Sequence, residues 1–343
     1  MLFIRGTMGA VSVGRAVRTL LLLLTLGGLN MAAVGQPAPL VLESKISLGD
    51  IRGRIDHLAV DLKRQRLYVA ELGNDSVGVV DLKEQKTIRT LAGLNEPQGI
   101  GYVPSTDTVY VANAGNGSVR LLQGEVLTPI GEISLGSDAD NVRVDDAANR
   151  VFIGYGSGAI AVIDTTTRRK LTDLALKDHP ESFQLEPSGD RIFVNVPGAH
   201  QIAVINRQSG QPVAVWKTPG LASNYSLAID MEQRRVIAVF RHPPTLGVFA
   251  INDGRLLNSV KTCSDADDVF IDSKRRRIYV ICGEGFVDVL TSGIQSFEAV
   301  ARVTTVSGAR TGLFIPELDR LVVAVRAAGG APAALWVFKP TAD

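Results

Sequence analysis

The sequence has little net charge and no short signature of a known catalytic centre. Its 36 Lys and Arg residues nearly balance 35 Asp and Glu residues, for a formal net charge of +1. Nothing global therefore favours nucleic acid or a membrane surface as a partner. The chain contains no serine-hydrolase elbow, no His-x-x-x-His zinc pair, no Cys-x-x-Cys-His haem site and no phosphate loop. We therefore predict neither haem nor a nucleotide as cofactor, and an enzyme would have to assemble its site from distant residues.

Residues 1–35 differ in composition from the rest of the chain. Arg5, Arg15 and Arg18 precede the apolar run "TLLLLLTLGGLNMAAV", and small residues follow at positions 33–35. This pattern is typical of a secretory signal peptide. The run is short for a transmembrane helix, so we expect no membrane anchor after cleavage, with an uncleaved anchor as the alternative. The sequence thus predicts a signal peptide over 1–35 and a mature protein that is periplasmic or secreted.

Seven similar apolar segments recur along the remaining chain, without a linker or low-complexity break. They begin at Arg66, Thr108, Arg150, Arg191, Arg235, Arg277 and Arg320, at intervals of 41 to 44 residues. A fixed period of about 40–45 residues that is rich in strands is typical of a propeller blade. We therefore predict one all-β domain over residues 36–343, a seven-bladed β-propeller.

Each period can be divided into four strands, here called a to d. In the first period these are "HLAVD" (57–61), "RLYVAE" (66–71), "SVGVVD" (76–81) and "TIRTLAG" (87–93). The b strands are nearly continuous apolar runs, which indicates that both of their faces pack against neighbouring blades. Five aromatic residues fall at one equivalent b-strand position and are predicted to be core: Tyr68, Tyr110, Phe152, Phe193 and Tyr279.

The two ends of the propeller sequence complement each other. The last repeat supplies only strands a, b and c and ends at "ALWVFKP", whereas "LVLESKISL" (residues 40–48) precedes the first a strand without a blade of its own. We predict that residues 40–48 form strand d of the seventh blade. This closure removes exposed sheet edges, which otherwise favour aggregation.

The segments "VYVANAGNGSV" and "LYVAELGNDSVGVVDL" resemble the YVTN-repeat β-propeller family. The resemblance covers the whole mature chain and implies an exported propeller. That family includes a DNA-binding periplasmic propeller, and related propellers include metal-dependent lactonases. The resemblance therefore implies two functions to weigh beside the reading of the residues themselves.

The loops of a four-stranded blade fall on two ends of the ring. The a-to-b and c-to-d turns share one end, here called the opposite face, where an acid is repeatedly followed five residues later by an arginine, as in "DLKRQR" and "DMEQRR". We predict that these pairs pin turns. The lysine and arginine clusters "LKRQR" and "SKRRRI" lie there as well, but the small overall excess of positive charge makes nucleic acid an improbable partner.

The b-to-c turns and d-to-a connections share the other end, here called the mouth. All four histidines and many acids fall there, and a concave site lined by one sign of charge concentrates counter-ions. Arginines at the same end provide the mixed charge that a polar ligand or an acid-base pair requires. We predict ligand-binding roles for Asp56, Glu181, Arg241, His242 and Arg310.

Two mouth loops repeat each other, "SDADNV" (137–142) and "SDADDV" (264–269), three blades apart. Their acids could converge into an oxygen-rich nest for Ca²⁺ or Mg²⁺. The alternative is that each aspartate only caps a strand and accepts backbone N–H groups in a tight turn. The predicted metal ligands, should a divalent cation bind, are Asp140, Asn141, Asn224 and Asp267.

Three functions follow in order of preference. The first is an exported binding or scaffold protein, a monomer whose acidic mouth binds a small polar ligand, a cation or another exported protein. The second is a metal-dependent hydrolase similar to propeller lactonases, using Ca²⁺, Mg²⁺ or Zn²⁺, with His57 or His179 as catalytic base. The third is DNA binding, which only the family resemblance implies. Whether the protein is an enzyme stays open at this point.

The only two cysteines, Cys263 and Cys282, fall at the mouth ends of neighbouring strands. Export favours oxidation, so a disulfide is the first interpretation. Buried free thiols and a soft-metal site with a nearby histidine are the alternatives.

Overall fold

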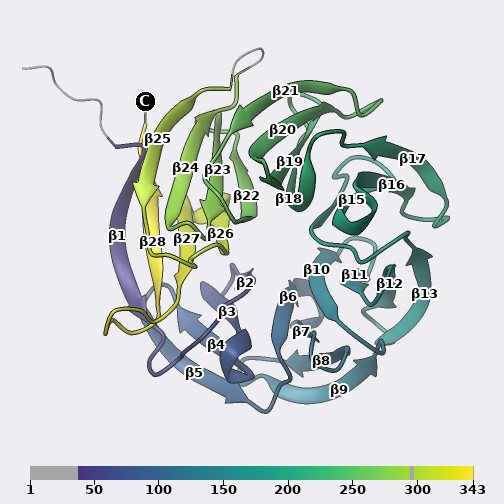
Figure 1. Ribbon diagram of the computed structural model, residues 1–343. Helices are drawn as coiled ribbons and strands as arrows, with labels where there is room; N and C mark the ends of the chain where they lie inside the picture. The colour runs from purple at the N-terminus through teal and green to yellow at the C-terminus, as the bar shows by residue number, and fades with distance from the viewer. Residues whose placement is uncertain (1–37, 294–296, 343) are drawn as a thin grey trace, which may run out of the picture. The chain divides into compact units, whose positions relative to one another are not determined.

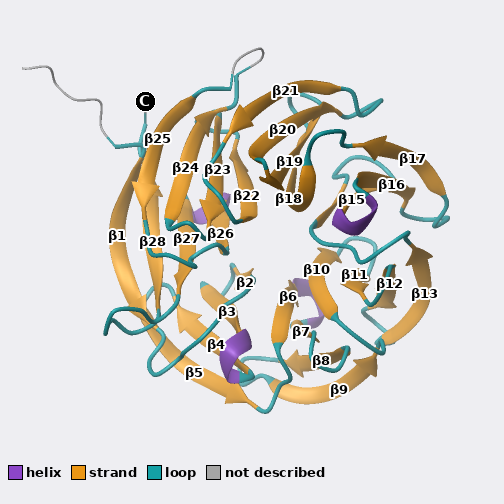
Figure 2. Cartoon of the chain, viewed as in Figure 1, coloured by secondary structure: helices purple, strands orange, loops and turns teal. Residues whose placement is uncertain are grey.

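The computed structural model describes residues 38–293 and 297–342, which form seven antiparallel sheets of four strands each. The sheets are the blades of a ring (Figure 1). Within this part of the chain the other regular elements are four short 3-10 helices: η1 (Leu72–Asn74), η2 (Pro104–Thr106), η3 (Pro197–Ala199) and η4 (Pro316–Leu318) (Figure 2). Among the described residues no helix has the length and apolarity to span a membrane. The predicted signal peptide lies outside the described residues.

In blades one to six the strands follow in chain order from the axis outward, and in blade seven the first strand of the chain takes the outer place. Blade one contains β2 (Leu58–Asp61), β3 (Arg66–Glu71), β4 (Ser76–Asp81) and β5 (Lys86–Ala92); blade two contains β6 (Pro97–Val103), β7 (Thr108–Asn113), β8 (Ser118–Gln123) and β9 (Thr128–Ser134). Blade three contains β10 (Ala139–Asp145), β11 (Arg150–Tyr155), β12 (Ala159–Asp164) and β13 (Arg169–Ala175); blade four contains β14 (Phe183–Leu185), β15 (Arg191–Val196), β16 (Gln201–Asn206) and β17 (Pro212–Lys217). Blade five contains β18 (Ala222–Asp230), β19 (Arg235–His242), β20 (Pro244–Ala250) and β21 (Leu256–Lys261); blade six contains β22 (Ala266–Asp272), β23 (Arg277–Cys282), β24 (Phe286–Thr291) and β25 (Ala299–Thr304). Blade seven contains β26 (Gly312–Ile315), β27 (Arg320–Val325), β28 (Ala334–Pro340) and β1 (Leu40–Ser47).

The b strands confirm the repeat. All seven begin at the residues from which the period was measured, β3 at Arg66 and β27 at Arg320 among them. The b strands β3 and β7 are almost wholly buried, whereas the outer strand β5 is largely exposed, because only inner strands have a neighbouring blade against each face. The five equivalent aromatic residues are at most 1% exposed, which confirms that they are core: Tyr68, Tyr110, Phe152, Phe193 and Tyr279.

The ring closes as predicted. Strand β1 pairs antiparallel with β28, and Figure 1 shows the purple first strand beside the yellow last one. Leu40 and Ile46 of β1 are buried between blades. The strand ends at Ser47, one residue before the predicted end, although the Leu48 amide still donates to the Ala333 carbonyl at 2.9 Å. Both ends of the propeller are thereby held in one sheet.

Two strand bounds in blade one differ slightly from prediction. Strand β2 begins at Leu58 instead of His57, because the His57 amide donates to the carbonyl of Gln98 in blade two at 3.3 Å. Strand β5 covers Lys86–Ala92 instead of 87–93, because Gly93 turns the chain with a φ of 86°. Each of these bounds is displaced from the prediction by one residue.

The predicted turn-pinning pairs on the opposite face form in blades four and five. Arg191 binds Glu186 at 2.5 Å, and Arg235 binds Asp230 at 2.8 Å, each five residues apart. In blade three Arg150 instead pairs with Asp164, across the strands β11 and β12. The spacing therefore predicts the partner only in some blades.

In blades one and six the acid pairs with a nearer arginine, which also reaches the following blade. Arg64 lies 2.7 Å from Asp61 of its own blade and 2.7 Å from Asp107 of blade two. Arg275 lies 2.9 Å from Asp272 and 2.6 Å from Asp319 of blade seven. These arginines link neighbouring blades in addition to pinning turns.

Candidate functional site

The inner ends of the blades surround a cavity of about 300 Å³ at the mouth. Every blade contributes at least one side chain to its wall, from His57 of blade one to Arg310 of blade seven. Eight of the predicted site residues line this cavity: His57, Asp140, Asn141, His179, Glu181, Arg241, Asp267 and Arg310. The ring therefore brings together at one place most of the candidates that the sequence had distributed over different blades.

A recurring backbone conformation directs these side chains toward the cavity. At one equivalent position, directly before the a strand or, for Ser223, at its second residue, the backbone has left-handed φ angles between 42° and 60°: Glu96, Asp138, Ser223 and Asp265. A bulge then interrupts the pairing at the start of each a strand that follows. Bulges commonly redirect side chains beside binding sites. In this protein they place the residue two positions after the left-handed one, such as Asp140 or Asp267, near the axis.

Arg54 lines the cavity but was not predicted to do so. It stands two residues before Asp56, as Asp138 stands two residues before Asp140, so an alignment of the d-to-a connections contains the signal for it. Its Nη2 atom lies 2.7 Å from Asp56 Oδ2. Asp56 itself is 1% exposed and does not line the cavity. The arginine therefore takes the place in the wall that was predicted for the aspartate.

Asp267 is paired with two arginines. Arg241 Nη2 lies 2.8 Å from Asp267 Oδ1, and Arg310 Nε lies 2.9 Å from Asp267 Oδ2. Asp265 lies outside this pair and contacts the same two arginines, at 3.4 and 3.1 Å. The Arg241 guanidinium also covers the Tyr225 ring, 3.7 Å from its centroid. Both oxygens of the carboxylate that was predicted to bind a metal ion thus face guanidinium groups.

Asp140, the equivalent residue in blade three, has no such partners. Its Oδ1 atom is buried and accepts no hydrogen bond, and the neighbouring Asn141 Oδ1 is in the same state. Asp140 is 7% exposed and Asn141 is 2% exposed. A buried acceptor without a donor costs about 1–3 kcal/mol, and such atoms are uncommon in folded proteins. This side of the cavity wall consequently presents acceptors that protein groups do not satisfy.

The acids of the wall bind protons more tightly than usual. Burial, with the charges of Asp56 and Glu181, raises the pKa of Asp140 to about 7 against the opposing effect of His57. Burial and the charge of Asp267 raise the pKa of Glu181 to about 7, although Arg241 opposes them. The empty mouth thus holds carboxylates whose ionisation would be favoured by an added positive charge.

His57 lies among three carboxylates. Its Nδ1 atom lies 3.8 Å from Asp268 Oδ1, and its Nε2 atom lies 3.8 Å from Asp56 Oδ1. Burial lowers the pKa of this histidine, but the charges of Asp268, Asp56 and Asp140 outweigh burial and raise it to about 10. A histidine held protonated in this way acts as a fixed charge at neutral pH and not as a general base.

The second predicted base, His179, is bound to the wall. Its Nδ1 atom lies 2.6 Å from the Gly156 carbonyl oxygen and 3.4 Å from Asp138 Oδ2. The nearby Ser182 hydroxyl accepts a hydrogen bond from Arg143 Nη2 at 3.3 Å. The segment "HPES" (residues 179–182) therefore contributes hydrogen bonds to the wall, and no hydrogen bond joins its histidine to the Ser182 hydroxyl within the described residues.

Besides Asp56, two predicted residues lie outside the cavity wall. Asn224 is fully buried between blades, where its Nδ2 atom donates to Asn195 Oδ1 at 2.9 Å and to the Gln201 carbonyl at 3.0 Å. His242 is exposed at the end of β19, with Nδ1 3.1 Å from Ser223 Oγ. In residues 38–293 and 297–342, no three His, Cys, Asp or Glu side chains are placed to hold a metal ion together. A bound divalent cation stays a prediction.

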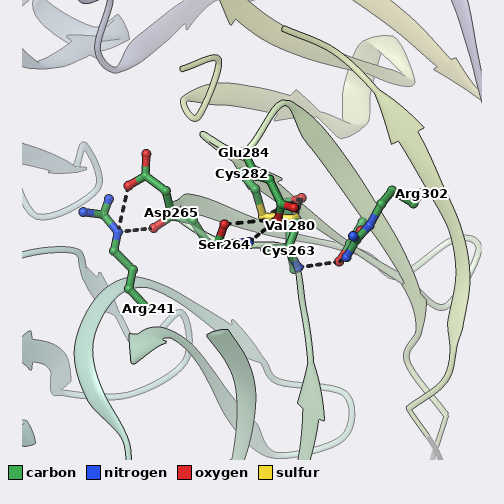
Figure 3. The surroundings of a disulfide bond; sticks show 10 residues. Arg241, Cys263, Ser264, Asp265, Val280, Cys282, Glu284 and Arg302 are labelled. Carbon is green, nitrogen blue, oxygen red and sulfur yellow. Dashed lines mark hydrogen bonds and ion pairs between the residues drawn. A yellow bond between two sulfur atoms is a disulfide. The ribbon is translucent and has the colours of Figure 1, made fainter. Parts of the chain in front are cut away.

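The disulfide predicted from the sequence is present between Cys263 and Cys282, whose Cα atoms lie 5.9 Å apart. It joins Cys263 of the β21–β22 connection to Cys282 at the end of β23. Cys263 stands two residues before Asp265, which contacts Arg241 (Figure 3). The Ser264 amide and hydroxyl donate to Glu284, at 2.8 and 3.1 Å. The loop that positions Asp265 and Asp267 is therefore tied to blade six at its base.

Reduction of this disulfide is expected to lower the stability of the protein by about 3 kcal/mol, because a bond between residues 19 apart restricts the unfolded chain. The measurement is a pair of thermal melts with and without reductant. A Cys263→Ser, Cys282→Ser variant should melt at the lower temperature in both conditions. Two titratable thiols in the denatured, unreduced protein would contradict the pairing.

Comparisons with known proteins address the fold. No protein-family model matches the sequence, and no curated protein does either. Solved structures resemble it: a chain of hydrazine synthase from Kuenenia stuttgartiensis is 17% identical with a TM-score of 0.75, over 86% of this chain and 97% of that chain. A chain of a mitotic checkpoint complex is 13% identical with a TM-score of 0.75, over 95% and 99% of the respective chains. Because both identities are low, the likeness supports the seven-bladed β-propeller fold and nothing finer.

Proposed function

We propose that this propeller is a binding protein whose mouth takes a small polar molecule that supplies hydrogen-bond donors. The observation that carries the proposal is the pair of buried acceptors in the cavity wall, Asp140 Oδ1 and Asn141 Oδ1, which no protein group satisfies. Buried polar atoms are normally satisfied by protein, water or ligand. A cavity of about 300 Å³ is at the lower end of the size of ligand pockets.

Binding is favoured over hydrolysis by the state of the candidate catalytic groups. His57 is held protonated by its neighbouring carboxylates, and Asp267 is paired with Arg241 and Arg310. A metal-dependent hydrolase would need both a base and a set of free carboxylates at this place. These groups instead form a fixed arrangement of charges suited to recognition.

The same proposal places the protein outside the cytoplasm, as a divergent member of the YVTN-repeat family. The supports are the sequence of residues 1–35, the two repeats that resemble the family, and the disulfide, which an oxidising compartment favours. We do not propose DNA binding, because Arg64 and Arg275 on the opposite face are each paired with two aspartates.

Thermal shift measurements with a panel of probes test the proposal. The panel contains an alkylammonium, an alkylguanidinium, a carboxylate, a neutral polyol, and the chlorides of Ca²⁺, Mg²⁺ and Zn²⁺. At least one of the donor-supplying probes, the alkylammonium, the alkylguanidinium or the polyol, is expected to raise the melting temperature of the wild type by a few degrees, since a ligand at 100 times its Kd stabilises by about 2.7 kcal/mol. The Asn141→Leu variant, which loses one acceptor and narrows the cavity, should respond much less.

The matched control is Lys83→Ser in an exposed c-to-d turn of the opposite face, which should respond as the wild type does. The proposal is overturned if no probe stabilises the wild type, or if Asn141→Leu is stabilised to the same extent.

A further inference from the structure

The two repeated loops of the mouth allow an internal comparison. Asp138 and Asp265 occupy equivalent positions with left-handed φ angles of 42° and 57°. In both loops a bulge follows, in β10 and in β22. Asp140 and Asp267 therefore enter the mouth from the same backbone geometry in blades three and six. Any difference in their surroundings must come from residues outside the loops.

In blade six the surroundings supply two cations. Arg241 comes from the preceding blade, six residues after Arg235, the first residue of β19. Arg310 comes from the following blade. It directly precedes Thr311, which in blade seven occupies the position equivalent to Asp140 and Asp267. Each guanidinium contacts one oxygen of Asp267, at 2.8 and 2.9 Å. The carboxylate thus lies between two cations, accepting a hydrogen bond from Arg241 at Oδ1 and forming an ion pair with Arg310 at Oδ2, where it accepts no hydrogen bond.

In blade three neither cation is present. The residue that corresponds to Arg241 is Ala114, six residues after Thr108, the first residue of β7. The residue that corresponds to Arg310 is Pro180, which directly precedes Glu181. Ala114 lies next to the loop, because its carbonyl accepts a hydrogen bond from the Asp138 amide at 3.2 Å. A methyl group and a pyrrolidine ring cannot donate to Asp140, and its Oδ1 atom is left without a partner.

The charges around the cavity show the same deficit. Seven carboxylates line it or pair with a residue that does: Asp56, Asp138, Asp140, Glu181, Asp265, Asp267 and Asp268. Four cationic side chains line the cavity, and Arg143 binds the lining residue Ser182, which makes five: Arg54, His57, Arg143, Arg241 and Arg310. Even with His179 protonated the carboxylates remain in excess. With every carboxylate ionised, as above the pKa of about 7 of Asp140 and Glu181, the wall is one to two positive charges short of balance.

We infer that the molecule bound at the mouth carries an N–H cation, a guanidinium or a primary ammonium group, which lies beside Asp140 as Arg241 and Arg310 lie beside Asp267. The inference rests on the proposed function and names the ligand's chemical class. Charge-assisted hydrogen bonds from such a group would satisfy Asp140 Oδ1 and Asn141 Oδ1 together.

Other cations fit this wall less well. A quaternary ammonium group has no N–H to donate to Asn141 and is recognised by aromatic faces, but the Tyr225 ring is already covered by Arg241 at 3.7 Å. Ca²⁺ takes six to eight oxygen ligands, and the described residues provide no group of three or more acidic or histidine side chains placed to hold a metal ion. Hydrogen-bond donors on a compact cation match the unpaired acceptors more closely.

The ligand should also change the protonation of the wall. A bound cation lowers the pKa of nearby acids, and burial has raised the pKa of both Asp140 and Glu181 to about 7 in the empty mouth. Binding at pH 7 is therefore expected to release protons. Calorimetry in two buffers of different ionisation enthalpy would measure the number released.

Titration calorimetry of the full mature protein with n-butylguanidinium and n-butylammonium tests the inference, with n-butanol, butyrate, tetramethylammonium and Ca²⁺ as comparison probes. At least one of the two N–H cations is expected to bind at least 10-fold more tightly than every comparison probe. Asp140→Asn should weaken that binding at least 10-fold. Ala114→Arg supplies the missing guanidinium from the protein itself and should abolish binding.

Ala114→Met is the matched control, since it adds similar bulk without charge and should bind more tightly than Ala114→Arg. If the arginine variant does not fold, Asp140→Asn and Asp140→Glu still decide, because only the second keeps the charge. Binding of butanol at the mouth as tight as that of the N–H cations would overturn the inference but leave the proposed function standing, because butanol also supplies a donor. Equally tight binding of butyrate, tetramethylammonium or Ca²⁺, which supply no donor, would overturn both. If no probe of any class binds, both fail.

Discussion

Removal of residues 40–48 is expected to leave a protein that no longer folds cooperatively at 37 °C. The deletion removes β1, the outer strand of blade seven, together with the buried side chains of Leu40, Ile46 and Leu48. Burial of each such side chain is worth about 1.5–3 kcal/mol, against a total stability of about 5–15 kcal/mol for a typical domain. The deletion also exposes the edge of β28 along its whole paired length, and such an edge favours aggregation.

Thermal melts and size-exclusion chromatography of the truncated protein would measure this loss. Deletion of residues 36–38 is the control, because the described contact that it removes is one hydrogen bond, from Thr341 Oγ1 to the Ala38 carbonyl at 2.8 Å. That bond is worth about 1 kcal/mol. Equal melting temperatures for the two truncations would disprove the closure of the ring by β1.

The second large effect concerns the two equivalent aspartates, whose replacement by asparagine should change stability in opposite directions. Burial raises the pKa of both, that of Asp267 to about 6 against the opposing charges of Arg310 and Arg241, but only Asp267 lies between two guanidinium groups that the substitution would deprive of a partner. Asp267→Asn leaves the guanidinium groups of Arg241 and Arg310, both mostly buried, with only Asp265 as an anionic partner. Removal of one member of a buried ion pair costs about 3 kcal/mol. Urea unfolding at pH 8 should show this loss as a lower midpoint with an unchanged slope.

Asp140→Asn should leave the ligand-free protein as stable as the wild type at pH 8, or about 1–2 kcal/mol more stable. The pKa of this aspartate is raised to about 7 by folding, so the folded protein holds the proton more tightly than the unfolded chain. Its contribution to stability therefore falls as the pH rises from about 4 to about 7. The variant removes this dependence, and its advantage should be larger at pH 8 than at pH 4.

Urea unfolding of both variants at the two pH values would compare the aspartates directly. Asp268 and Asp56 remain beside His57 in either variant, which limits the indirect effect on that histidine. A similar loss of stability from both substitutions would show that Asp140 has protein partners after all, and the proposed ligand class would lose its main support.

Most of the fold could be predicted because a blade is a local unit. Each repeat of 41 to 44 residues contains its own strands and turns, so alternating apolar segments and turn residues suffice to place them. The role of β1 followed from counting, since the last repeat lacked one strand and residues 40–48 lacked a blade. Strand bounds shifted by one residue, as for His57, whose amide donates to Gln98 of blade two while its carbonyl accepts from Ala70 of blade one.

The location of the site could be predicted from the sequence, but not which of its charged side chains pair with each other. The similarity of the two "SDAD" loops places Asp140 and Asp267 at equivalent positions, and both line the cavity. Their different states depend on Ala114 and Arg241, which lie in other blades, so the two repeated loops contain no sign of which aspartate is paired. Asn224 was predicted as a ligand because it falls in a mouth loop, yet its amide is bound to Asn195 and Gln201.

By itself the sequence determined the number of blades, the strand that closes the ring and the end of the ring where the charged residues gather, since all three depend on the order of short segments along the chain. Only the tertiary structure decided which charges neutralise each other. Arg310 reaches Asp267 across a blade boundary, and no residue from a neighbouring blade donates a hydrogen bond to Asp140 Oδ1 within the described chain. Such contacts depend on distances of a few ångströms between residues that are remote in sequence, and the free energy of an ion pair changes steeply over that range.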